Sequence, residues 1–179
     1  MKLRDIIELV TYAEELADFQ YRPREYELIA QLLTQVNEKP LNKPHGLILL
    51  HLYRIQMPAE LLHECKVLLP LWIRLTHALV DVISSCGHLK PLMLCMQFCQ
   101  MLVQGMWINE SPLLQILDRP TVRLLTENYE IKDISEFVDM DDEERKKVLK
   151  GKDIDRIAAA CNRFPTIGVK CELGERNEE

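Results

Sequence analysis

Five polar side chains recur within an apolar stretch of the chain, and their types are those that bind through charge and hydrogen bonds. They are Arg74, His77, Asp81, Ser84 and Ser85. Spacings of three and four residues place such side chains along one stripe of a helix. The stripe would either face a solvent channel or form an internal polar network. In the second case His77 pairs with Asp81, and a neighbouring helix satisfies Arg74.

A second group of side chains has the donor types of a zinc site: Cys86, His88, Cys95 and Cys99. Cys95 and Cys99 lie four residues apart in a segment rich in Leu and Met, and the group lacks the ligand spacing of structural zinc sites. The chain's six cysteines fall mostly within apolar helical pattern. We therefore interpret them as buried free thiols, and we expect neither a metal site nor a disulfide framework.

Motifs of the common enzyme classes are absent from the sequence. None of the six glycines belongs to a phosphate-binding loop followed by Lys and Ser or Thr. The sequence also has no nucleophile elbow and no His-Glu-x-x-His segment. We therefore predict that the chain is not an enzyme, with no catalytic residue and no cofactor.

The overall charge limits how the chain could bind nucleic acid. A net charge of -6 and a pI near 5.5 argue against a surface that grips phosphates by bulk electrostatics, so such contact must be local. Charged residues stand near Met1, where the apolar core of a signal peptide would begin. The longest strongly apolar run, Val67 to Ile73, is too short to cross a bilayer. We expect a soluble protein that does not contact membranes.

Helical periodicity dominates the chain and predicts an all-α fold with one long central helix. That helix covers 59 to 85, about 40 Å, and Pro70 should kink or split it. Its apolar residues surround most of the axis, so we expect burial on most sides. A loop is predicted over 37 to 44. Further bundle helices are predicted over 3–19, after Pro23, over 45–56 and over 91–107.

Shorter and more polar helices are predicted from 118 to 165. Asp133, Asp141 and Asp153 each stand where an N-cap belongs. Residues 166–173 alternate apolar and polar types as a half-buried strand does. We therefore expect a helical bundle over 1–117, a small helix-loop-helix domain over 118–165, and the first strand of a truncated β domain over 166–179.

Motifs spread over almost the whole chain resemble one helicase-associated family. Arg74-Leu75 is followed by Ala78-Leu79-Val80-Asp81-Val82-Ile83-Ser84-Ser85 in the long helix. As an ordered set with two flanking motifs, this segment resembles the Sec sixty-three homology module of Ski-two-like helicases, in particular the C-terminal module of the large spliceosomal RNA helicases. The flanking motifs are His51-Leu52-Tyr53-Arg54 and Cys161-Asn162-Arg163-Phe164-Pro165.

The resemblance implies a helical bundle, a helix-loop-helix domain and the start of an immunoglobulin-like β domain. In that family one bundle helix, the ratchet helix, crosses the exit path of the single strand, and it corresponds here to the helix of the polar stripe. By this likeness Arg74 would meet a phosphate, and Asp81 would orient His77. His77, Ser84 and Ser85 would hydrogen-bond or stack against the strand.

The resemblance further implies a non-catalytic accessory module of a nuclear RNA helicase in pre-mRNA splicing. Such a module would bind helicase motor domains and spliceosomal proteins, and single-stranded RNA weakly. Two alternatives stay open: a pure protein-binding module without RNA contact, and the same homology unit from the endoplasmic-reticulum protein translocation machinery. The sequence departs from the family pattern at His88, where a Trp is expected, and near Tyr129-Glu130, where a glycine is missing.

Overall fold

The computed structural model describes residues 2–165 and 167–170, and it divides the chain into two compact units. The first unit ends at Glu110 and the second begins at Ser111, whereas we placed the boundary between 117 and 118. The 3-10 turn η3 (Pro112–Gln115) belongs to the second unit. It is tied there because the Ser111 hydroxyl donates a hydrogen bond to the carbonyl oxygen of Lys132, over 2.8 Å.

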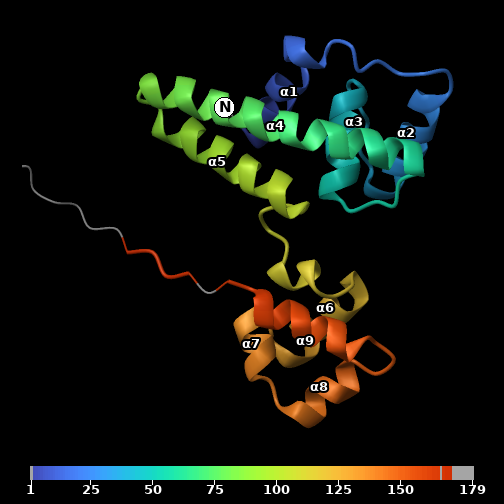
Figure 1. Cartoon of the computed structure of the whole chain (residues 1–179), viewed down its shortest axis with the longest axis vertical. Helices are drawn as coiled ribbons and strands as arrows, with labels where there is room; N and C mark the ends of the chain where they lie inside the picture. The colour runs from blue at the N-terminus through green and yellow to red at the C-terminus, as the bar shows by residue number, and fades with distance from the viewer. Residues whose placement is uncertain (1, 166, 171–179) are drawn as a thin grey trace, which may run out of the picture. The chain divides into compact units, whose positions relative to one another are not determined.

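The first unit is a helical bundle built around the long helix α4 (Ala59–Ser85) (Figure 1). α5 (Leu89–Gln104) runs back along α4. Gly87 makes the turn between them with a φ of 72°, a left-handed conformation that costs glycine little. Three shorter helices complete the bundle: α1 (Leu3–Thr11), α2 (Glu25–Leu33) and α3 (Lys43–Leu52), with the 3-10 turns η1 (Glu14–Leu16) and η2 (Thr34–Val36).

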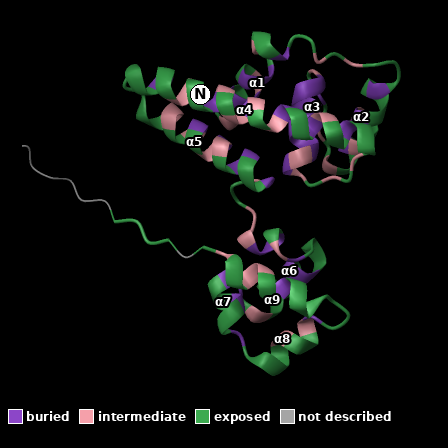
Figure 2. Cartoon of the chain, in the orientation of Figure 1, coloured by how far each residue is buried: buried purple, intermediate pink, exposed green. Residues whose placement is uncertain are grey.

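The long helix has the bounds that we predicted. Of the two outcomes expected at Pro70, the split does not occur and the kink stays a prediction. Pro70 is exposed, so water can replace the backbone hydrogen bond that a proline removes. The expectation of burial on most sides is wrong, because Val67 and Val82 are 53% and 60% exposed. Figure 2 marks the buried residues of α4 in purple, and their helical spacing places them on one side of the helix; they are Leu61, Cys65, Leu68, Trp72, Thr76 and Ile83.

The first helix is shorter than we predicted. α1 ends at Thr11 rather than near Phe19, and Ala13 is extended with a ψ of 143°. On the face of α1 that carries Ile6 and Val10, the next helical positions are Ala13 and Ala17, whose small side chains bury little surface, so additional turns gain little from packing. The loop that follows lets η1 insert Leu16, which is 3% exposed, into the core.

Two sets of polar contacts hold the bundle together. The His51 Nε2 atom lies 2.8 Å from the Leu102 carbonyl oxygen, and Arg54 donates to the carbonyls of Gly105 (2.7 Å) and Gln104 (2.9 Å) at the end of α5. His51 and Arg54 of the His-Leu-Tyr-Arg motif therefore hydrogen-bond the end of α5, where backbone carbonyl groups lack helical donors. The second set is a buried ion network around Lys43.

In this network, the Lys43 Nζ atom lies 2.8 Å from a Glu25 carboxylate oxygen and 2.6 Å from one of Glu64. Lys43 is 3% exposed, and Arg22 also pairs with both carboxylates. Burial alone would raise the pKa of Glu25, but the Arg22 backbone N–H and the Lys43 ammonium hold that pKa below its usual range. The network joins the starts of α2 and α3 to the first turns of α4.

The second unit consists of short helices, and its N-caps are as we predicted. The side chain of Asp133 accepts a hydrogen bond from the Glu136 backbone N–H over 2.9 Å, and Asp141 and Asp153 cap the next two helices in the same way. Glu130 adopts a φ of 57°, a conformation that favours glycine. The helices are α6 (Arg119–Tyr129), α7 (Ile134–Asp139), α8 (Asp142–Val148) and α9 (Ile154–Arg163).

Over residues 2–165 and 167–170 the fold is all-α, as predicted. The strand predicted over 166–173 includes residues 166 and 171–173, which lie outside the described part, so it stays a prediction. By length and composition alone, α4 could cross a membrane. α4 also carries Lys66, Arg74 and Asp81, each of which would be costly in a bilayer.

Candidate nucleic-acid interface on the long helix

The predicted polar stripe lies on the side of α4 that faces away from the core. At 3.6 residues per turn, its five residues stand roughly 180° from the buried series that includes Trp72 and Ile83. Arg74, His77, Asp81, Ser84 and Ser85 are all exposed. The stripe is therefore open to solvent, and an internal polar network at these positions is excluded.

The contacts of the stripe differ from the pairing that we considered. The His77 Nε2 atom lies 3.2 Å from the Cys99 sulfur on α5, and no interaction joins His77 to Asp81 among the described residues. Burial raises the pKa of the Cys99 thiol, so this thiol stays protonated and can donate to the ring. The contact fixes the ring on the α5 side of the stripe, and Asp81 does not orient it.

The hydroxyl group of Thr76 lies on the buried side of α4, whereas those of Ser84 and Ser85 lie on the exposed side. The Thr76 hydroxyl donates to the Trp72 carbonyl oxygen over 2.8 Å on the buried side. The Ser85 hydroxyl donates to the Val82 carbonyl oxygen over 2.7 Å, a local bond that an external acceptor could replace. Ser84 and Ser85 therefore offer their hydroxyl groups to solvent at the end of α4.

Sequence reasoning missed two residues of the same face. His63 and Lys66 are exposed and continue the stripe toward the start of α4, because 63, 66, 70, 74 and 77 follow the same helical spacing. The signal was present in the sequence, but the expected break at Pro70 separated these residues from the others. We use the name polar stripe for the complete set: His63, Lys66, Arg74, His77, Asp81, Ser84 and Ser85.

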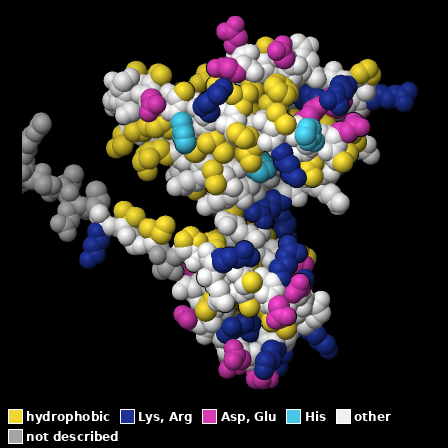
Figure 3. Space-filling model, viewed as in Figure 1, with side chains coloured by type: hydrophobic (Ala, Val, Ile, Leu, Met, Phe, Trp, Pro, Cys, Tyr) yellow, Lys and Arg dark blue, Asp and Glu magenta, His cyan; other side chains and the backbone are white. Residues whose placement is uncertain are grey.

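The charge of the polar stripe is modest. Lys66 and Arg74 are its permanent cations, and Asp81 is its one carboxylate. Figure 3 shows a visible face of the first unit on which hydrophobic side chains are interspersed with basic, acidic and histidine side chains. Such a surface can hold one or two phosphates and offer hydrogen bonds to a strand, but it cannot bind by bulk electrostatics.

The cysteine and histidine side chains do not form a metal site among the residues that the structure describes. No group of three or more His, Cys, Asp or Glu side chains in this part of the chain could hold a metal ion. Of the four zinc candidates, Cys95 is buried while Cys86 and His88 are exposed. The expectation of buried thiols is wrong for Cys86.

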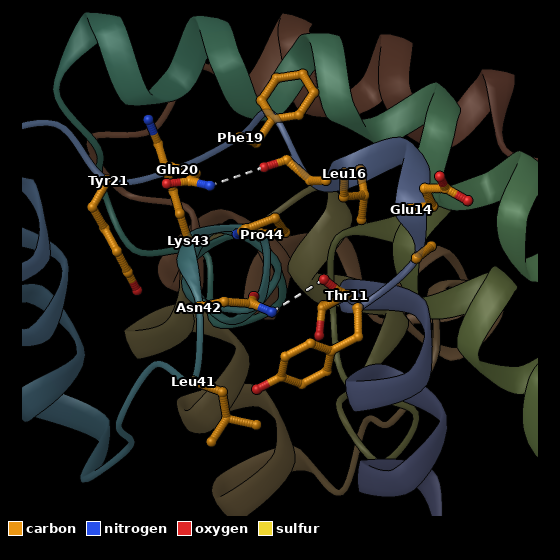
Figure 4. Close-up of a pocket in the computed structure, with 13 residues that line it drawn as sticks. Thr11, Glu14, Leu16, Phe19, Gln20, Tyr21, Leu41, Asn42, Lys43 and Pro44 are labelled. Carbon is orange, nitrogen blue, oxygen red and sulfur yellow. Dashed lines mark hydrogen bonds between the residues drawn. The ribbon is translucent and has the colours of Figure 1, made fainter.

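A hollow of about 610 Å³ lies where the loop after α1 meets the start of α3 (Figure 4). Two of its polar side chains, Asn42 and Gln20, already hydrogen-bond within the fold, whereas the buried Tyr21 hydroxyl has no hydrogen-bond partner. The Asn42 amide donates to the Thr11 carbonyl oxygen over 3.1 Å, and the Gln20 amide donates to the Ala17 carbonyl oxygen over 3.4 Å. Burial raises the pKa of Tyr21 to about 12, with smaller contributions from Tyr26 and Glu25, so this phenol is neutral. We assign no ligand to the hollow.

Comparison with known proteins gives a consistent result. The family described as Sec63 Brl domain matches residues 1–178. The human U5 small nuclear ribonucleoprotein 200 kDa helicase is 33% identical over 188 residues, 98% of this chain and 9% of that protein. The DExH-box ATP-dependent RNA helicase DExH12 of Arabidopsis thaliana is 33% identical over 186 residues, 96% of this chain and 9% of that protein. The pre-mRNA-splicing factor brr2 of Schizosaccharomyces pombe is 28% identical over 188 residues, 99% of this chain and again 9% of the relative.

Proposed function

The chain belongs to the family of Sec63 Brl domains, and from this membership we propose that it is a non-catalytic accessory module of an ATP-dependent RNA helicase of pre-mRNA splicing. It would act as a scaffold for proteins and as a guide for single-stranded RNA. Its partners would be helicase motor domains and spliceosomal proteins, and its location the nucleus. The names of the relatives, which include an RNA helicase and a splicing factor, support this proposal.

The exposure of the polar stripe is the observation that carries the RNA part of the proposal. Arg74 and Lys66 are exposed on one helix face, and guanidinium and ammonium groups are the usual partners of phosphate oxygens. His77, Ser84 and Ser85 add hydrogen-bonding groups and one ring that could stack on a base. Asp81 would weaken phosphate binding, and this fits a guide that releases the strand.

A pure protein-binding module is the second candidate, and the surface of α5 favours it. Leu89, Met93, Met96 and Val103 are 71%, 48%, 48% and 64% exposed. Their spacing places them on one face of α5. Exposed apolar surface of this kind is typical of a contact with another protein, and it requires no RNA.

Binding of an oligouridine of about twelve nucleotides to the chain at low salt separates the two candidates. We expect weak binding that Arg74→Glu reduces, because each phosphate contact to a single strand contributes roughly 0.7 to the slope of log affinity against log salt. Fluorescence anisotropy measures both the affinity and that slope.

Arg4→Glu is the matched control, since Arg4 is an exposed arginine on α1 of the same unit. If Arg74→Glu and Arg4→Glu bind like the unchanged chain, the strand-guide part of the proposal fails. If the unchanged chain shows no binding at low salt, the pure protein-binding candidate is favoured.

A further inference from the structure

The second unit contains a cleft of about 470 Å³. More basic than acidic side chains line it, although the protein as a whole is acidic. One wall runs from Gln115, the last residue of η3, to Asp118, and the other is the start and one face of α9. Lys152, Arg156 and Arg163 all line it. Figure 3 shows Lys and Arg side chains on the visible face of this unit.

The two carboxylates that line the cleft are already engaged within the protein. Asp118 lies 2.6 Å from the Lys152 ammonium and also accepts a hydrogen bond from the Thr121 hydroxyl, and these contacts lower its pKa. Asp153 accepts a hydrogen bond from the Arg156 backbone N–H over 3.0 Å as the cap of α9. Neither carboxylate therefore forms an ion pair with the guanidinium group of Arg156 or Arg163.

Those guanidinium groups are open to an external anion. Arg163 donates from Nε to the Ala159 carbonyl oxygen of its own helix over 3.1 Å, which leaves its terminal nitrogens for other acceptors. Arg156 is exposed, and its side chain contacts no acidic group among the described residues. The two arginines lie seven residues apart, so they share one face of α9.

The rest of the cleft is aliphatic. Ile116, Leu117, Ile157 and Ala160 line it, and no aromatic ring is among its described lining residues. Proteins that bind single-stranded nucleic acid commonly stack bases on aromatic side chains, and this cleft offers none. Paired cations beside an aliphatic wall instead match a peptide in which acidic residues flank a Leu or Ile.

We propose that the cleft between the 115–118 segment and α9 binds an acidic peptide segment of a partner protein, with Arg156 and Arg163 on its carboxylates. The aliphatic wall accommodates an apolar side chain of the same segment. This inference gives the protein-binding part of the proposed function a site. The peptide site can be refuted independently of the RNA contact, because no residue of the polar stripe lines the cleft.

The test uses a fluorescein-labelled peptide with the sequence Glu-Asp-Leu-Asp-Glu-Leu-Glu and the whole chain. Arg156→Glu should weaken peptide binding by roughly threefold to tenfold. Each exposed ion pair contributes little binding free energy, but reversing the charge of residue 156 replaces attraction by repulsion. Arg156→Gln should give an intermediate loss. Arg123→Glu is the matched control, because Arg123 is an exposed arginine on α6 that pairs with Glu127 outside the cleft.

Two further titrations separate the possible outcomes. A peptide with Lys in place of every acidic residue should not bind, and Arg74→Glu should leave binding of the acidic peptide unchanged. The proposal is overturned if the acidic peptide fails to bind the unchanged chain, or if Arg156→Glu and Arg123→Glu have equal effects. It is also overturned if an oligouridine, rather than the peptide, depends on Arg156.

Discussion

Lys43→Met should destabilise the first unit by about 3 kcal/mol. Lys43 is 3% exposed and Glu25 is 8% exposed. Removing one partner of a buried ion pair leaves the other charge uncompensated, which lowers the free energy of unfolding by about 3 to 5 kcal/mol. The lower end of that range applies because Arg22, which is 56% exposed, remains beside Glu25 and Glu64. For a unit of this size, the melting temperature should fall by roughly 10 to 20 °C.

The pH dependence gives this prediction a second test. In the unchanged chain the pKa of Glu25 is lowered, so its stabilising contribution is present above the unfolded pKa and is lost as pH falls through the folded pKa. In the variant only Arg22 still opposes the effect of burial, so the pKa of Glu25 is higher than in the unchanged chain, and protonation of Glu25 relieves the penalty as pH falls. The stability difference between the two proteins should therefore be largest at neutral pH and shrink toward about pH 4.

Urea unfolding followed by tryptophan fluorescence measures this effect in the first unit alone. Both tryptophans of the chain, Trp72 and Trp107, lie in that unit. Lys39→Met is the matched control, because Lys39 is exposed in the loop before α3. A loss below about 1 kcal/mol, or a difference that grows toward acid pH, would refute the role given to the buried network.

Four other changes have defined outcomes. Asp133→Ala removes a cap and should cost about 1 kcal/mol, visible as a lower urea midpoint by circular dichroism; an unchanged midpoint would contradict it. Glu130→Gly should stabilise the second unit by about 0.5 to 1 kcal/mol, because glycine adopts positive φ without strain, and a loss of stability would count against that reading. Arg54→Ala should cost about 1 to 2 kcal/mol by tryptophan fluorescence, since it frees two carbonyls at the end of α5. Among the cysteines that the structure describes, iodoacetamide should modify exposed Cys86 first and Cys65 last, because burial raises the pKa of Cys65 to about 11, and mass spectrometry of digests would reveal the reverse order.

Features that depend on neighbouring residues could be predicted from the sequence. The bounds of α4 and the caps at Asp133, Asp141 and Asp153 agree with the structure, because capping is decided within one turn of the chain. The positive φ of Glu130, by contrast, was not predicted from the sequence.

Features that depend on distant packing could not be predicted in this way. The apolar residues of α4 surround most of its axis, and only the positions of α1, α3 and α5 decide which of them are buried. The exposure of Pro70 and the burial of Lys43 depend on how the helices pack. The role of the polar stripe stays a prediction, although its exposure is a property of the structure.

Pro70 gives the long helix a point of lower bending stiffness. A proline has no backbone N–H, so the carbonyl oxygen of Lys66 has no helical donor. That oxygen belongs to a residue of the exposed face, and water or an external hydroxyl group can hydrogen-bond it without unfolding a turn. The halves of α4 on either side can thus tilt against each other, and backbone amides next to Pro70 should exchange with deuterium faster than those around Leu79, more than two turns further along α4.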